Sequence, residues 1–208
     1  LGTDYVDLLQ WHINVQDETM DSALDGFRQL KQAGKVRAFG LSTSDFEYFK
    51  AFNAEDDCAT LQIDYSILNR TPEAEIFPYC QAHDIGVIVR GPLAMGILTG
   101  KFSAESSFPD GDFRRNWIDN PDENRIFMDD LAKVEALKPL AEGRTLAQLA
   151  LQFSFTHPAV STTIPGAKTV AQLKENLKAA ELGTLSEEDM AVIDDLVPPG
   201  GGRRIWPA

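Results

Sequence analysis

Leu61-Gln62-Ile63-Asp64-Tyr65-Ser66-Ile67-Leu68-Asn69-Arg70 is the stretch that decides the fold, because an apolar, β-rich run ends there in polar side chains. The pattern predicts a buried strand with Gln62 and Tyr65 at its carboxyl end. In proteins built from repeated strand–helix units, functional groups gather at that end of each strand. The stretch therefore predicts a parallel sheet and one part of a ligand site.

Four further apolar runs of the sequence end in the same way. The polar residues at or just after their ends are His12, Ser42, Arg90 and Lys168. Helical patterns separate the runs, with Gly or Pro at the joints, and each unit occupies roughly 25 to 30 residues. Strands that alternate with helices favour a parallel sheet. We therefore expect these polar side chains to share one rim.

The helices between the strands are predicted from apolar residues at helical spacing. The first, Met20 to Ala33, ends at Gly34, which is typical of a helix C-cap. Ser186, followed by three acidic residues, is expected to open the last helix. Further helices are expected at 46–52, 73–83, 126–141, 146–156 and 170–180.

The regular alternation breaks between Gly96 and Arg144. The polar stretch 103–123 predicts a loop, which we interpret either as a mobile flap over the rim or as an ordinary surface excursion. Residues 1–197 are expected to form one domain. Residues 198–208 are expected to be a mobile C-terminal tail.

The composition excludes several classes of protein. With 208 residues, 43% hydrophobic and 25% charged, the chain can bury a substantial core. A formal net charge of −13 would repel nucleic acid and anionic lipid, so neither is expected as a partner. No apolar run approaches the roughly 18 residues that a membrane helix requires. Cys58 and Cys80 are isolated, which favours a reducing, cytoplasmic location, and the oligomeric state is left open.

Five strand–helix units of one direction fit either an open doubly wound sheet or part of a barrel. No Gly-x-Gly-x-x-Gly follows the first strand, as a Rossmann cofactor site needs, and Gly200-Gly201-Gly202 has no strand or helix around it. In addition, polar residues end every strand rather than clustering at one switch point. Both observations favour the barrel.

Five motifs spread over nearly the whole chain support this choice. They are LGTDYVDLL at 1–9, GLS at 40–42, the strand of Gln62, GPLAMGILTGKF at 91–102, and IPGAK at 164–168 with QLKEN at 172–176. In this order and spacing they resemble the aldo-keto reductase family, most closely its bacterial-type branch. The resemblance implies an α/β fold, the (β/α)8 TIM barrel, of which only the last five βα units would be present here. It also implies an NADPH-dependent reductase of a small-molecule carbonyl, an aldehyde or a ketone.

The family's catalytic set is an Asp, a Tyr, a Lys and a His, and the resemblance matches only the His. His12 would donate a hydrogen bond to the substrate carbonyl and stabilise developing negative charge; the alternative is a structurally bonded core residue. The chain enters a core strand directly after Leu1, which suggests a fragment, so the other three residues would lie upstream. We expect the isolated chain to be inactive. Trp11 and Tyr65 are expected in the substrate pocket, with core packing as the alternative for Tyr65.

The resemblance also assigns the nicotinamide end of the cofactor site. Ser42 and Gln62 would hydrogen-bond the carboxamide and fix which ring face meets the substrate. Thr43 stands where relatives often carry Asn. Arg90 would stack on the nicotinamide in place of an aromatic ring. The alternatives are a Gln62 that bonds to loop backbone and an Arg90 that is an ordinary surface residue.

The phosphates and the adenosine would lie further along the rim. Backbone amides around Gly91, Leu93 and Gly96 would hold the pyrophosphate, with Lys101 closing over it. Lys168 would pair with the 2′-phosphate at a helix N-terminus. The remaining expected cofactor residues are Gly166, Gln172, Glu175 and Asn176. Because Gly166 and Gln172 are less basic than their counterparts in relatives, NADH is kept as the alternative to NADPH.

A second class of function is a non-catalytic chain on the same fold. It would be a degenerate reductase, or a nucleotide-sensing regulatory subunit like the potassium-channel β subunits. Nothing in the sequence indicates a channel partner.

Overall fold

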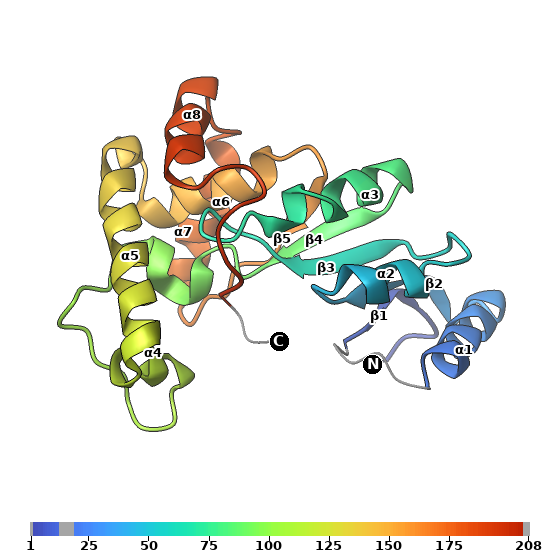
Figure 1. The fold of residues 1–208 in the computed structure, drawn as a ribbon. Helices are drawn as coiled ribbons and strands as arrows, with labels where there is room; N and C mark the ends of the chain where they lie inside the picture. The colour runs from blue at the N-terminus through green and yellow to red at the C-terminus, as the bar shows by residue number, and fades with distance from the viewer. Residues whose placement is uncertain (1, 13–18, 206–208) are drawn as a thin grey trace.

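Parallel pairing of five consecutive strands forms the centre of the fold in the computed structural model, which describes residues 2–12 and 19–205 (Figure 1). Each strand pairs with the next one along the chain, in the order β1-β2-β3-β4-β5. The strands are β1 (Val6–Trp11), β2 (Val36–Ser42), β3 (Thr60–Asp64), β4 (Gly86–Arg90) and β5 (Val160–Thr163). The predicted parallel sheet is therefore confirmed.

Helices fill the connections between the strands, mostly where the apolar spacing predicts them. They are α1 (Met20–Gln32), α2 (Phe46–Phe52), α3 (Ile76–Ala82), α4 (Asn116–Asp119), α5 (Pro121–Leu137), α6 (Leu146–Thr156), α7 (Val170–Glu181) and α8 (Glu187–Leu196). Short 3-10 helices are η1 (Thr71–Glu73), η2 (Ala94–Thr99), η3 (Phe113–Arg115) and η4 (Lys138–Ala141). The Ser186 side chain accepts from the backbone N–H of Asp189, which confirms the predicted cap of α8.

The expected loop at 103–123 is wrong in its second half. Helix α4 lies within it, and α5 begins at Pro121 rather than at Ile126. The Asn120 side chain accepts from two backbone N–H groups of the first turn of α5, and proline is well suited to the first helical position. The sequence carried this Asn-Pro start signal within a stretch whose polarity suggested a loop.

The core lies between the sheet and its covering helices. Leu61 and Ile63 of β3 are at most 1% exposed, and they alternate with the half-buried Gln62. Phe39 of β2 stacks on Phe27 of α1 at 5.5 Å between ring centroids. The apolar residues therefore point toward the helices, and the alternate positions are left for polar side chains.

The sheet is open in the described part of the chain, since β1 and β5 each pair with one neighbour only. Helix α7, which follows β5 in the chain, buries a single side chain, that of Ala179. Val170, Leu173 and Leu177 of the same helix remain exposed. One helix face and two strand edges are therefore uncovered.

The C-terminal segment 198–205 is held against the sheet rather than extending freely as expected. The backbone N–H of Arg70 donates to the carbonyl of Gly201 over 2.9 Å, and that of Arg203 donates to Leu68 over 2.9 Å. Ile205 is 6% exposed. In Figure 1 this dark red segment runs past the carboxyl ends of β3 and β4. The rest of the predicted tail, 206–208, lies outside the described residues.

Candidate functional site

The carboxyl ends of β2, β3 and β4 bring several of the predicted residues together. Ser42 pairs in register with Gln62, and Asp64 pairs with Arg90. Arg90 also reaches back toward β2, because its Nη2 donates to Oγ of Ser44 over 3.3 Å. These residues form one continuous rim, as the strand-end pattern predicts.

Ser42 and Thr43 are held in place by the turn that follows β2. Both side chains are buried, with 6% and 1% exposure. The Thr43 N–H donates to the carbonyl of Gln62, and its Oγ1 accepts from the N–H of Asp45, the N-cap of α2. The turn thus connects the β2 end rigidly to β3.

Gln62 is engaged by another side chain. Its Nε2 donates to Oε1 of Gln10 over 3.0 Å, so this amide nitrogen is bonded to a side chain rather than to loop backbone. A ligand carboxamide would have to exchange this bond for its own. The predicted role of Gln62 remains a prediction.

Arg90 lies half-buried at the end of β4. Burial lowers the pKa of its guanidinium, the nearby Asp64 carboxylate opposes that change, and the charge of Arg204 lowers the pKa further. The guanidinium of Arg90 is therefore half-buried and close to both an acid and a second cation, whereas an ordinary surface arginine is surrounded by water.

A strained turn follows β4. Ala94, Met95 and Gly96 have φ values of 48°, 56° and 97°, in the left-handed region that side chains disfavour. A Cβ on Gly96 would lie 3.0 Å from Nζ of Lys101. Strain of this kind persists where surrounding structure enforces it, often at ligand sites. The turn therefore brings bare backbone beside a lysine ammonium, which suits a phosphate.

Three cations come together next to this turn. Desolvation lowers the pKa of the Lys101 ammonium, and the charges of Arg114 and Lys168 lower it further. Asp112 is paired with Arg114, which together with weaker effects lowers the pKa of the Asp112 carboxyl to about 2. We call Lys101, Arg114 and Lys168 the cationic cluster.

Arg114 is a candidate that sequence reasoning missed. It belongs to the stretch expected as a loop, yet its guanidinium lies 5.7 Å from the ring centre of Phe102 and 5.0 Å from that of Phe108. Arginine stacked on two aromatic rings has a defined position. The available signal was the presence of Phe102, Phe108 and Phe113 in a stretch that is otherwise polar.

The turn between β5 and α7 places the predicted adenosine residues side by side. The Lys168 N–H donates to Oε1 of Gln172 over 2.7 Å, and Asn176 Nδ2 donates to the Gly166 carbonyl over 3.4 Å. The carbonyl of Glu175 accepts from Gln148 of α6. These residues surround the N-terminus of α7, whose backbone N–H groups favour an anion.

His12 and Trp11 lie at the edge of the sheet. Trp11 pairs with Leu41 in register, so the exposed His12 follows at the level of Ser42. The Trp11 ring packs edge-on against Phe27 of α1, at 5.8 Å between ring centroids. Its contacts are therefore on the helix side of β1 and do not show a pocket wall.

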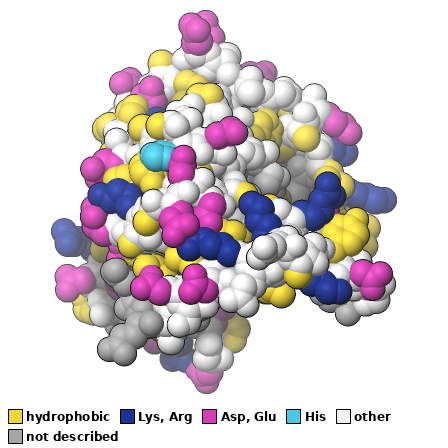
Figure 2. Space-filling view, turned by 90° about the vertical axis from the view of Figure 1, so that its right-hand side faces the viewer, with side chains coloured by type: hydrophobic (Ala, Val, Ile, Leu, Met, Phe, Trp, Pro, Cys, Tyr) yellow, Lys and Arg dark blue, Asp and Glu magenta, His cyan; other side chains and the backbone are white. Residues whose placement is uncertain are grey.

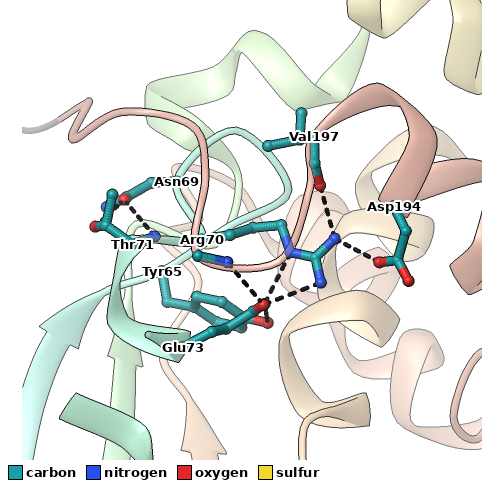
Figure 3. Close-up of polar contacts among 8 residues, drawn as sticks. Tyr65, Asn69, Arg70, Thr71, Glu73, Asp194 and Val197 are labelled. Atoms are coloured by element: carbon teal, nitrogen blue, oxygen red, sulfur yellow. Dashed lines mark hydrogen bonds and ion pairs between the residues drawn. The ribbon is translucent and has the colours of Figure 1, made fainter. Parts of the chain in front are cut away.

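Tyr65 packs in the core, which was the alternative to its place in a substrate pocket. It is 1% exposed, stacks at 5.3 Å on Phe153 of α6, and donates its hydroxyl to Glu73 Oε1 over 2.6 Å (Figure 3). Tyr65 continues the alternation of the buried Leu61 and Ile63, so its side chain lies on the helix side of the sheet rather than toward the rim. Burial beside the Glu73 carboxylate raises the pKa of the Tyr65 hydroxyl, which makes it a poorer acid.

The structure also has an open groove of about 880 Å³ between α6 and α7. Its basic side chains are Arg144, Lys174 and Lys178, and it includes the predicted adenosine residue Glu175. Arg144 is paired there with Asp189 and Gln152.

No group of three or more His, Cys, Asp or Glu that could hold a metal occurs among residues 2–12 and 19–205. In the same residues, no helix combines the length and apolarity needed to cross a membrane.

Comparison with known proteins gives a consistent result. The sequence model of the aldo/keto reductase family matches residues 1–198. An uncharacterized oxidoreductase of Bacillus subtilis, YqkF, is 30% identical over 193 residues, which cover 93% of this chain and 60% of that protein. A probable voltage-gated potassium channel subunit beta of Arabidopsis thaliana is 33% identical, covering 88% of this chain and 58% of that protein.

Solved structures agree with the sequence relatives. The holo form of the aldo-keto reductase AKR11C1 from Bacillus halodurans superposes with a TM-score of 0.75 at 32% identity, covering 93% of this chain and 62% of that one. An aldo/keto reductase from Klebsiella pneumoniae, in complex with NADP and acetate, superposes with a TM-score of 0.69 at 27% identity. The match covers 95% of this chain and 60% of that one. The chain thus spans about 60% of the length of the proteins it matches.

Proposed function

Because the chain belongs to the aldo/keto reductase family, we propose that it forms the cofactor-binding part of an oxidoreductase that reduces aldehydes or ketones with NADPH. In this proposal, the five parallel strands are the last five units of the family's (β/α)8 barrel. The rim at their carboxyl ends is then the mouth at which cofactor and substrate meet.

The observation that carries the proposal is the cationic cluster. The chain has a formal net charge of −13, and Asp and Glu side chains are spread over the face seen in Figure 2. Even so, Lys101 and Arg114 both lie over the ring of Phe102, and the charges of Arg114 and Lys168 both act on Lys101. Grouped cations in an acidic protein are a favourable site for a polyanion such as the phosphates of a dinucleotide.

The nicotinamide end fits the buried polar groups of β2 and β3. Ser42 and Gln62 are neighbours in register, so both can hydrogen-bond one carboxamide. Arg90, at the end of the next strand, offers a planar guanidinium beside them. The strained turn 94–96 and the N-terminus of α7 then supply backbone N–H groups for the phosphates.

Bound NADPH supplies the hydride for the carbonyl carbon. This chain's residues would orient the two reactants, and His12 would donate a hydrogen bond to the carbonyl oxygen as negative charge develops there. The proton for that oxygen needs another source. Tyr65 is buried against Glu73, and Tyr79 accepts a hydrogen bond from Asn53, so neither serves as an exposed acid. We propose that the Tyr, Lys and Asp of the family pattern complete the site from outside this chain.

The choice of NADPH over NADH depends on the 2′-phosphate. Lys168 begins the turn into α7, and its charge reaches Lys101 and Asp112. The solved relative from Klebsiella pneumoniae contains NADP. A lysine at this place would distinguish the two cofactors, because NADH lacks the phosphate that it pairs with.

The test is a fluorescence titration of the chain with NADPH and NADH. Replacing Lys168 by Met should weaken NADPH binding about tenfold, equal to about 1.4 kcal/mol, and leave NADH binding nearly unchanged. Lys35→Met is the matched control, because Lys35 is an exposed lysine just before β2, at the amino end of the sheet and away from the rim. No change in fluorescence up to millimolar NADPH would reject the proposal.

The second candidate is a non-catalytic, nucleotide-sensing chain, which the similarity to the potassium channel subunit favours. A complete enzyme and a sensor would both bind NADPH but only the enzyme would oxidise it. We expect the isolated chain to show no NADPH oxidation with aldehydes above that of a His12→Ala variant. Oxidation that exceeds this control would show that the chain needs no residues from elsewhere.

A further inference from the structure

The C-terminal segment is fastened at its start by a buried ion-pair network (Figure 3). Arg70 is 3% exposed and donates through Nη1 to the carbonyl of Val197 over 2.7 Å and to Oδ1 of Asp194 over 2.6 Å. Its other nitrogens bind Glu73, which also accepts from the N–H of Gly200. The end of α8 and the residues after it are therefore fixed to η1.

The same segment is fastened again at its far end. Gly202 forms an antiparallel bridge with Asn69, and Arg203 donates through Nη2 to the buried Asp130 of α5 over 2.6 Å. Ile205 is 6% exposed, and its N–H donates to Oδ2 of Asp64 over 3.4 Å. Arg204 consequently lies between two residues that are each held in place.

Arg204 itself is exposed and directed at the rim. Its Nη2 donates to the carbonyl of Ser44 over 3.1 Å, while Nη2 of Arg90 donates to Oγ of the same serine over 3.3 Å. The charge of Arg204 also lowers the pKa of Arg90. Two guanidiniums from distant parts of the sequence thus converge on one residue.

The acid whose charge acts on Arg90 is Asp64. It is 2% exposed, and its Oδ2 already accepts from Asn69 over 2.9 Å and from the N–H of Ile205. One buried, hydrogen-bonded carboxylate that acts on Arg90 does not balance the two guanidiniums of Arg90 and Arg204, so the pair keeps a net positive charge. An incoming anion would relieve the repulsion between the two cations.

We propose that Arg204, together with Arg90, forms an oxyanion subsite at the rim that binds a carboxylate or phosphate group of a small molecule. A guanidinium suits either group, because its planar N–H pairs match two oxygens of one anion. Arg204 needs little ordering on binding, since both of its neighbours are held. Naming the ligand as substrate or cofactor rests on the proposed function, whereas the subsite itself rests on this geometry.

The subsite is tested by calorimetric titration of the chain with inorganic phosphate and with acetate, at an ionic strength kept constant with NaCl. Arg204→Gln should weaken the binding of at least one of these anions fivefold or more. Arg204→Lys keeps the charge but loses the planar pair of N–H donors. Its affinity for the anion should therefore lie between those of the wild type and Arg204→Gln. Arg37→Gln is the matched control, because Arg37 is exposed near the amino end of β2, at the opposite edge of the sheet. Equal affinity in wild type and Arg204→Gln, or equal losses in Arg204→Gln and Arg37→Gln, would overturn the proposal.

The source of the anion is separated by titrating NADPH into the same samples with and without saturating acetate or phosphate. Competition that disappears in Arg204→Gln assigns the subsite to a cofactor phosphate. Independent binding of NADPH and acetate, with only acetate sensitive to Arg204, assigns it to a carboxylate-bearing substrate. Binding of an anion that depends on Arg204 without any NADPH binding would retain the subsite and reject the proposed function.

Discussion

Gln62 on β3 and Gln10 on β1 are joined by a 3.0 Å side-chain hydrogen bond, although β2 lies between their strands. The β2 residue in register with Gln10 is Gly40, which pairs on its other side with Thr60, whereas Gln62 itself pairs with Ser42. Because glycine has no side chain, the two long amides can meet across the middle strand. Gly40 is therefore a requirement of this rim, and its replacement is informative.

Gly40→Ala should destabilise the fold. The new Cβ would lie 2.5 Å from the carbonyl oxygen of Thr60, so a strand or the backbone would have to shift. Overpacking of this kind costs about 1–3 kcal/mol. Urea unfolding measures the loss, and Gly26→Ala within α1 is the control, because a Cβ there meets nothing within 4 Å. The unfolding free energy of Gly26→Ala should exceed that of the wild type by about 0.5–1 kcal/mol, because alanine favours a helix interior over glycine. Equal stability of the two variants would contradict the argument.

Much of this rim follows from local sequence patterns. The runs that contain Ser42, Gln62 and Arg90 are strands, and their ends meet because parallel strands align their carboxyl ends. Periodicity and capping residues are local signals, so the helices they predict are largely confirmed. The family resemblance is also confirmed, by the match over residues 1–198.

The differences arise where contacts are distant in sequence. Arg204 meets Ser44 across 160 positions, and Arg203 meets Asp130 across 73, which no local pattern of a Gly-rich tail indicates. Tyr65 differs for another reason: it continues the alternation of the buried Leu61 and Ile63, so it faces the helices although it stands just after the strand.

Arg70→Met should cost about 3–5 kcal/mol in unfolding free energy, because it leaves the Glu73 carboxylate buried without its cation. The two side chains are only 4% and 7% exposed. Equilibrium denaturation would show the loss. Adding Glu73→Gln should recover part of it, since the amide carries no charge and still accepts from Tyr65. By contrast, Arg37→Gln breaks a pair that is 68% and 76% exposed, and should cost under about 1 kcal/mol. A small effect of Arg70→Met would mean that water reaches Glu73.

His157 should make stability depend on pH. Burial lowers the pKa of its imidazole, and its Nδ1 accepts from the N–H of Ala159, which requires the neutral ring. The unfolded chain, with a pKa of about 6.5, therefore takes up a proton first as the pH falls. Stability is then full above about pH 6.5 and decreases below it. In His157→Phe the ring packing on Phe77 is retained and the titration is lost. The loss of unfolding free energy between neutral and mildly acidic pH should be smaller in this variant; an identical loss would refute the assignment.

The uncovered face of α7 should make the isolated chain self-associate. Val170, Leu173 and Leu177 are 69%, 49% and 62% exposed, and β5, the strand before α7 in the chain, has an unpaired edge among the described strands. Exposed apolar surface and open strand edges both promote association. Sedimentation velocity should show species larger than a monomer. Leu173→Lys with Leu177→Lys should shift the chain toward monomer without lowering its melting temperature, because neither side chain is buried. Val192→Lys, on the 41% exposed position of α8, should leave the distribution unchanged. A wild-type chain that sediments as a single monomer and melts cooperatively would show that this surface needs no cover.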